Sequence, residues 1–195
     1  MSRILFFFLA GTMLLSCKSD YDKLVRSQLD SGVIHEELIF DMKMGDTKKE
    51  FYAICWELNN QQKVSQGPYN QMVKYIIEPE EIPGETEKIE MLFYGNFDGE
   101  DVLRGMNFRF AYINWAPWNE ELHAEKLIEK LQQYFVDMYG GNEFIEVDLG
   151  LKDIKSYVKV DGNRQIVIYP QTTKDVIAKV EDLRYRLTKK EKDEV

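Results

Sequence analysis

Cysteine and histidine are scarce in this chain. Its 195 residues include two cysteines, Cys17 and Cys55, and two histidines, His35 and His123. A framework of several disulfides is therefore excluded, and the spacing of these four residues matches no zinc ligand set. A nucleophilic cysteine would also need a base, for which only the two histidines are candidates.

Basic residues are fewer than acidic ones, 25 against 34, and the formal charge is −9 at pH 7. Removing residues 1–16 would remove Arg3 and no acidic residue, so the remaining chain carries a charge of −10. Proteins that bind nucleic acid neutralise phosphates with Lys and Arg, and basic segments adsorb to anionic lipid. The charge therefore argues against nucleic acid as a partner and against electrostatic binding to a membrane.

Motifs of the common enzyme classes are also missing. The sequence contains no serine nucleophile elbow, no glycine-rich phosphate loop and no dinucleotide fingerprint. Carboxylates are numerous, but a catalytic pair is defined by geometry that the sequence does not give. We therefore expect a binding protein without a cofactor or metal, with a hydrolase as the less favoured alternative.

One long apolar run is present, and it lies at the N-terminus. Arg3 precedes an almost wholly apolar stretch from Ile4 to Leu15. A helix of this length would rise roughly 18 Å, which is short of the ~30 Å hydrocarbon core of a bilayer. The pattern is that of a signal peptide rather than of a permanent membrane span.

The end of this run resembles the lipobox of bacterial lipoproteins. Leu14, Ser16 and Cys17 match that pattern, whereas Leu15 stands where a smaller residue is more usual. The resemblance implies cleavage before Cys17, a diacylglyceryl group on its sulfur and acylation of the new amino group. Two or three acyl chains anchor a protein stably, at ~0.8 kcal/mol per buried methylene. We expect a lipid-anchored protein of the bacterial cell envelope, in the outer membrane on its periplasmic or surface face. An ordinary secretory signal is the alternative.

An acylated Cys17 would leave Cys55 as the other cysteine and exclude an intramolecular disulfide. Cys55 shares a helical apolar face with Phe51, Ile54 and Leu58. Because free cysteine is among the most buried residue types, we interpret Cys55 as a small core residue.

Hydrophobic periodicity predicts helices alternating with runs of strands. Thr47 and Glu50 form a capping box at the start of one helix, and Asn119 is the expected cap of another. The expected helices cover residues 21–29, 48–59 and 120–139. The expected strands cover residues 38–44, 71–78, 88–96, 102–114, 144–149, 155–160, 164–169 and 175–180, with turns at 98–99 and 161–163.

These elements predict an α+β fold with helices packed on an antiparallel sheet. Their order indicates two tandem units, each a helix followed by three or four strands. We divide the chain into a signal peptide (1–16), a tether (17–22), one body (23–187) with halves at 23–114 and 115–187, and a charged tail (188–195).

The segment Gly45-Asp46-Thr47, at an expected strand-to-helix turn, resembles the opening of BamE and β-lactamase-inhibitor-like lipoprotein folds. That resemblance implies layers of helix and antiparallel strand that bind protein partners. The anchor, residues 55–59 and residues 115–119 resemble uncharacterised lipoproteins of Bacteroidetes, which implies no known activity.

The best candidate site is an aromatic loop. Trp115, Pro117 and Trp118 lie between a strand and a helix, with Tyr112 just before them. If exposed, these rings would form a stacking platform for a sugar or an anchor for an envelope protein partner. If buried, they would fill the junction of sheet and helix, which is the arrangement that we expect. We expect a binding or interaction module, with a glycan or small-ligand protein using this loop as the alternative.

Two acidic clusters have spacings that can hold metal ions. Glu120 and His123 are three residues apart on an expected helix, but Glu at a helix start also complements the helix dipole. The residues around Gly99 resemble half of a calcium loop, without its full spacing or its closing Glu. They are Asn96, Asp98, Glu100 and Asp101. We expect a helix start and a solvated turn instead of metal sites.

Overall fold

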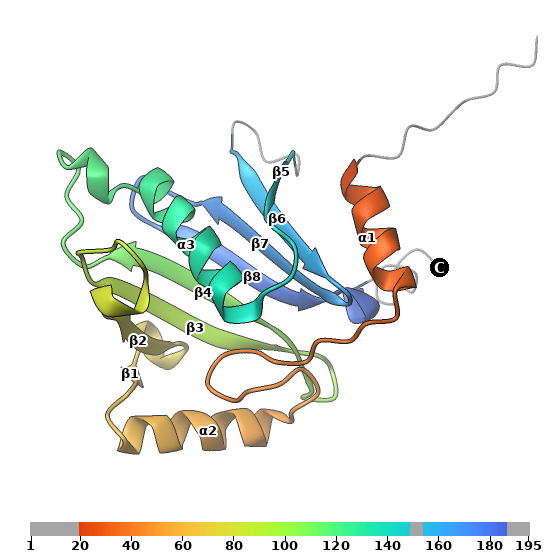
Figure 1. Cartoon of the computed structure of the whole chain (residues 1–195). Helices are drawn as coiled ribbons and strands as arrows, with labels where there is room; N and C mark the ends of the chain where they lie inside the picture. The colour runs from red at the N-terminus through yellow and green to blue at the C-terminus, as the bar shows by residue number, and fades with distance from the viewer. Residues whose placement is uncertain (1–19, 149–153, 187–195) are drawn as a thin grey trace, which may run out of the picture.

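The computed structural model describes residues 20–148 and 154–186 (Figure 1). Cys17 lies outside these ranges. The α-helices are α1 (Asp20–Asp30), α2 (Lys48–Asn60) and α3 (Ala124–Tyr139), and the 3-10 helices are η1 (Pro68–Asn70), η2 (Pro79–Glu81) and η3 (Glu120–Leu122). The strands are β1 (Ser65–Gln66), β2 (Val73–Ile77), β3 (Ile89–Phe97), β4 (Leu103–Tyr112), β5 (Ile145–Val147), β6 (Ser156–Asp161), β7 (Arg164–Pro170) and β8 (Val176–Asp182). No helix in the described ranges is long and apolar enough to cross a bilayer.

The described strands form one eight-stranded antiparallel sheet in the order β1-β2-β3-β4-β8-β7-β6-β5. β1–β4 and β5–β8 are two meanders, and their last strands pair with each other. α2 precedes the first meander and α3 precedes the second. The expected α+β class, with helices on an antiparallel sheet, is confirmed. Apart from residues 38–44 and the start of α3, the expected elements agree with the observed ones to within two residues at each end.

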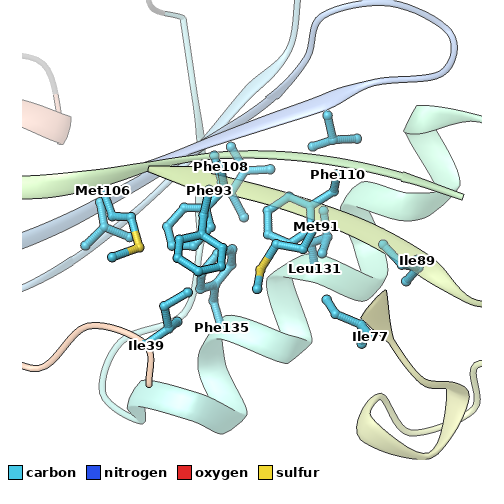
Figure 2. Packing of buried hydrophobic residues seen from close by; sticks show 14 of the residues in the cluster. Ile39, Ile77, Ile89, Met91, Phe93, Met106, Phe108, Phe110, Leu131 and Phe135 are labelled. Carbon is cyan, nitrogen blue, oxygen red and sulfur yellow. The ribbon is translucent and has the colours of Figure 1, made fainter. Parts of the chain in front are cut away.

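The main hydrophobic core lies between α3 and one face of the sheet (Figure 2). Leu131 and Phe135 are buried on one side of α3, against Phe93, Phe108 and Phe110 of β3 and β4. The ring of Phe135 meets those of Phe108 and Phe110 edge-on, with centroids 5.9 and 6.1 Å apart. Each fully buried phenylalanine contributes about 1.5–3 kcal/mol through removal of apolar surface from water.

A smaller core lies on the opposite face of the same sheet. Val25 of α1 packs with Val158, Val160 and Val167. Neighbouring residues of β7, such as Ile166, point instead into the main core, because successive side chains of a strand alternate between faces. The second meander is therefore covered by α3 on one face and by α1 on the other.

α2 lies along the β1–β3 end of the sheet (Figure 1). The predicted capping box is present: Thr47 accepts a hydrogen bond from the Glu50 amide, and the Glu50 carboxylate accepts one from the Thr47 amide. Phe51, Cys55 and Leu58 are buried on the inner side of α2. Cys55 is thus the core residue that the sequence indicated.

Residues 38–44 do not form the expected strand. Glu37 and Lys43 make an isolated bridge around a tight turn in which Phe40 and Asp41 adopt positive φ. The ring of Phe40 packs edge-on against Tyr75, with centroids 5.1 Å apart, and also meets Phe93. The alternating apolar residues therefore fill the core from a turn, and tertiary packing outweighs the strand pattern.

The sequence predicts that Asn119 caps α3, but it does not. It precedes η3 and makes no capping hydrogen bond with its side chain. The chain becomes extended at His123, and the Ala124 amide donates to the carbonyl of Thr173 in the β7–β8 loop. A distant loop satisfies this amide at the start of α3, so the helix begins four residues later than expected.

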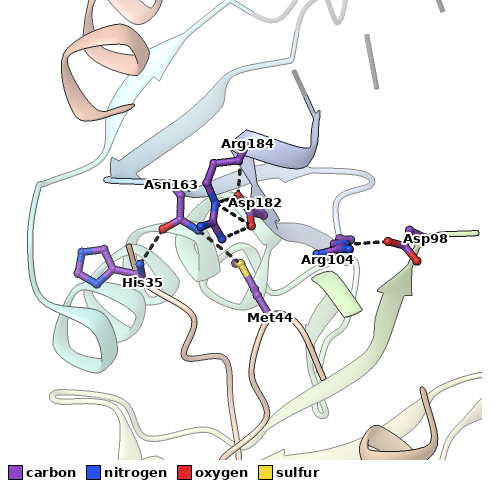
Figure 3. Close-up of polar contacts among 7 residues, drawn as sticks. All are labelled: His35, Met44, Asp98, Arg104, Asn163, Asp182 and Arg184. Atoms are coloured by element: carbon purple, nitrogen blue, oxygen red, sulfur yellow. Dashed lines mark hydrogen bonds and ion pairs between the residues drawn. The ribbon is translucent and has the colours of Figure 1, made fainter. Parts of the chain in front are cut away.

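A polar cluster joins the segment before α2 to the end of the β6–β7 hairpin (Figure 3). The His35 amide donates to the Asn163 side-chain oxygen over 2.6 Å. Asp182 accepts hydrogen bonds from the amide and the guanidinium of Arg184. Gly162, at φ +53°, lies so close to Val33 that a Cβ there would be 2.2 Å from the Val33 carbonyl oxygen. This turn therefore requires glycine both for its conformation and for space.

Candidate functional site

The residues of the predicted aromatic site differ in burial and in their partners. Tyr112 is buried and donates a hydrogen bond to Glu85, and burial together with that carboxylate raises the pKa of its phenol. Trp115 is half-buried, donates its indole N–H to the Thr173 carbonyl and lies beside His123. Trp118 is 85% exposed. The burial expected for this loop is therefore wrong for Trp118, and the three rings differ in their exposure to solvent.

A pocket of about 860 Å³ lies elsewhere, between α2 and the β1–β3 end of the sheet. We call it the α2–β3 pocket. Its lining comes from α2, from the segment that runs from Val64 through β1 to the first residue of β2, and from β3. The lining residues are Phe51, Tyr52, Cys55, Trp56, Asn59, Val64, Ser65, Gln66, Asn70, Gln71, Met72, Val73, Tyr94, Gly95 and Phe97.

The α2 wall of the pocket follows from helical spacing. Tyr52, Trp56 and Asn59 are separated by four and three residues, so they form a stripe along the helix. This stripe lies next to the buried stripe of Phe51 and Cys55. Tyr52 is 57% exposed and Trp56 is 67% exposed, so both rings remain accessible at the mouth of the pocket.

The facing wall comes from the end of β3. Tyr94 is 44% exposed, whereas the Phe97 ring packs edge-on against Phe51 with centroids 5.4 Å apart. A Cβ at Gly95 would lie 2.7 Å from side-chain atoms of both Phe97 and Leu103. Glycine at this position therefore lets two apolar side chains close against the strand beneath the pocket.

The connection between β1 and β2 supplies carboxamide groups. Gln66 ends β1, and Asn70 and Gln71 lie at and after η1. Tyr69 and Asn70 both adopt positive φ, 56° and 59°. A Cβ at Gly67 would be 2.8 Å from the Met72 carbonyl oxygen, so the two limbs of the connection approach closely only with glycine there.

The pocket is uncharged. Among the described residues, its lining contains no Asp, Glu, Lys, Arg or His side chain. Burial raises the pKa of Cys55 to about 11, so its thiol is protonated at neutral pH and is a poor nucleophile. Five aromatic rings and four carboxamides dominate the lining instead. This arrangement offers apolar contact and neutral hydrogen bonds to a ligand.

The most deeply buried charges near α3 have a structural role. Lys159 is fully buried, forms an ion pair with Asp161 over 2.6 Å and donates to the carbonyls of Gly140 and Asn142. The Arg164 guanidinium lies 4.0 Å from the centroid of the Tyr139 ring. Lys159 thus places a positive charge at the C-terminus of α3, where the helix dipole and free carbonyls favour a cation.

The acidic clusters considered as metal sites have other partners. Asp98 accepts from the amides of Glu100 and Val102 and pairs with Arg104, which accounts for the lowered pKa of its carboxyl. His123 precedes α3 in extended conformation. Within residues 20–148 and 154–186, no group of three or more His, Cys, Asp or Glu has the arrangement of a metal site.

The sequence interpretation missed the α2–β3 pocket. The sequence does contain a pattern that indicates one wall of the pocket. Tyr52, Trp56 and Asn59 form a stripe beside the apolar stripe of α2. Trp56 belongs to residues 55–59, which contribute to the resemblance to Bacteroidetes lipoproteins. Comparison of the chain with protein-family models, curated proteins and solved structures gave no match.

Proposed function

We propose that this chain is a lipid-anchored protein of the bacterial cell envelope that binds a neutral ligand in the α2–β3 pocket and releases it unchanged. One observation carries the proposal. Charged residues make up 30% of this chain, but the described lining of the pocket of about 860 Å³ has no acidic or basic side chain. Aromatic and amide side chains dominate that lining instead. Such a lining suits a ligand without net charge, because a buried unpaired charge is costly.

The anchor belongs to the same proposal and is supported by the N-terminal sequence. Leu14, Ser16 and Cys17 follow a short apolar run, and α1 begins at Asp20. Three residues of extended chain reach at most about 10 Å. A lipid on Cys17 would therefore hold the ligand-binding body close to the membrane surface.

Two exposed tryptophans allow a matched test of the pocket. The lipoprotein would be reconstituted in nanodiscs and incubated with the uncharged fraction of an envelope extract, and the retained molecules would be identified by mass spectrometry. We expect retention by the wild type and by Trp118→Ala, and loss with Trp56→Ala, because only Trp56 lines the pocket. Equal retention by all three proteins, or retention by none, would contradict the proposal.

Trp118 supports a second candidate function, the binding of an envelope protein. Its ring is almost fully exposed, and Ile113 in the same connection is 48% exposed. Exposed tryptophan is enriched among residues that dominate protein interfaces. Crosslinking in the native membrane should give an adduct that Trp118→Ala loses and Trp56→Ala retains; the reverse pattern would exclude this surface.

A further inference from the structure

We infer that the α2–β3 pocket binds a neutral oligosaccharide, with a sugar ring stacked on Trp56. This inference rests on the proposed function, because it names the chemical class of the ligand at the same pocket. The properties that support it are the exposure of the aromatic rings, the kind of polar groups among them and the size of the pocket.

The aromatic rings at the mouth of the pocket are exposed to solvent. Trp56 and Tyr52 on α2 and Tyr94 on β3 each keep between 44% and 67% of their surface accessible, while Phe51 in the same lining is buried. An aromatic face carries partial negative charge and attracts the weakly positive C–H groups of a flat ligand. A pyranose ring presents such C–H groups on its faces and hydroxyls at its edge.

The polar groups between the rings suit hydroxyl groups. Asn59 and Gln66 contribute carboxamides from two different elements, and Asn70 and Gln71 contribute two more. A carboxamide both donates and accepts hydrogen bonds, as a sugar hydroxyl does. An anionic sugar or a phosphate would instead need Arg or Lys, and neither lines the described pocket.

The competing neutral ligands fit less well. An acyl chain favours a wholly apolar lining, whereas four carboxamides and Ser65 contribute polar surface here. An extended peptide would pair with an open strand edge. β1 has only two residues, and the part of β3 that extends past its pairing with β2 spans only residues 94–97, so either edge is short for such a ligand. The volume of about 860 Å³ lies in the upper part of the roughly 300–1,000 Å³ range of small-ligand pockets. It therefore accommodates more than one sugar ring.

Calorimetry on the nanodisc-bound lipoprotein tests the ligand class. The probes are neutral oligomers of two to four glucose, mannose, xylose or N-acetylglucosamine units, with oligogalacturonate as the charged counterpart. A neutral fatty alcohol and an uncharged tetrapeptide represent the competing classes. We expect at least one neutral oligosaccharide to bind, and oligogalacturonate to bind roughly tenfold more weakly or not at all.

Variants locate the binding site. Trp56→Ala should weaken saccharide binding roughly tenfold or more, and Trp118→Ala should leave it unchanged. Tyr52→Ala, on the same stripe of α2, provides a second pocket variant if the first does not fold, and circular dichroism and a thermal melt check each protein.

The outcomes separate this inference from the proposed function. Binding of the fatty alcohol or the peptide, with no oligosaccharide bound, would overturn the ligand class and leave a neutral-ligand pocket in place. Saccharide binding that Trp56→Ala and Tyr52→Ala do not change would also overturn the inference. If the panel and the uncharged envelope fraction both fail to bind, both proposals are wrong.

Discussion

Asp182 shows how one buried carboxylate joins three separate segments. Its side chain is 4% exposed and lies at the end of β8, beside Asn163 of the β6–β7 turn, which in turn binds the His35 amide (Figure 3). Burial alone would raise the pKa of Asp182. Hydrogen bonds from Arg184 and Asn163 outweigh burial and hold this pKa below its usual value.

The lowered pKa gives a pH dependence with a defined sign. A carboxyl whose pKa is lower in the folded state stabilises the protein above its unfolded pKa, about 3.9, and loses that contribution as pH falls through the folded value. Asp182→Asn should cost roughly 1–3 kcal/mol at pH 7 and progressively less as pH falls below about 4. Urea unfolding of both proteins at pH 7, 5 and 3 measures the difference.

Asp137→Asn provides the control for this experiment, because Asp137 is an exposed carboxylate on α3. We expect Asp137→Asn to lie within about 0.5 kcal/mol of the wild type at pH 7. A free-energy difference between wild type and Asp182→Asn that stays constant from pH 7 to pH 3 would show that the charge of Asp182 does not stabilise the fold.

At the scale of the element, α2 supplies both a capped helix and one wall of the pocket. Thr47→Ala removes the hydroxyl that accepts a hydrogen bond from the Glu50 amide. The Glu50 amide at the start of the helix then has no side-chain acceptor. Loss of such a cap costs roughly 1 kcal/mol. Chemical denaturation should detect this loss, and Lys49→Ala, in the exposed first turn, should show a smaller change. Equal stability of Thr47→Ala and wild type would mean that the capping box contributes nothing.

Local signals predicted most of the elements. The Thr47–Glu50 box and the turn at residues 161–163 are decided by neighbouring residues, and both occur as expected. Phe40 was misassigned because its positive φ accompanies contacts with Tyr75 and Phe93, which lie far along the chain. The start of α3 was misplaced for the same reason, since the Ala124 amide is satisfied by Thr173.

The pocket was harder to predict than the helix that forms its wall. The stripe of Tyr52, Trp56 and Asn59 is visible in the sequence, but periodicity does not say what faces it. β3 reaches the pocket only because it pairs between β2 and β4 in a specific register and extends past the end of β2. Long-range register is set by packing over the whole sheet, which no short window contains.

At the scale of the molecule, two four-stranded meanders share one sheet, and the pocket lies at the end farthest from β5. The sheet continues through the β4–β8 pairing, and the main core contains residues from both meanders. The pocket is therefore supported by a core that extends well beyond it. The predicted mature charge of −10 disfavours adsorption to anionic lipid, so the proposed membrane location depends on Cys17.

Replacement of Cys17 tests that dependence directly. In Cys17→Ala the sulfur that would accept the diacylglyceryl group is absent, so we expect the chain to lose the acyl mass and to leave the membrane fraction. Cys55→Ala is the matched control, because Cys55 is the only other cysteine in the sequence and its thiol is buried beside the pocket. Intact mass and detergent partition, measured on the chains isolated from cells, should change for the first variant and not for the second. If Cys17→Ala keeps the wild-type partition and shows only the mass difference of the substitution, the chain is not a lipoprotein and its ligand need not lie at a membrane.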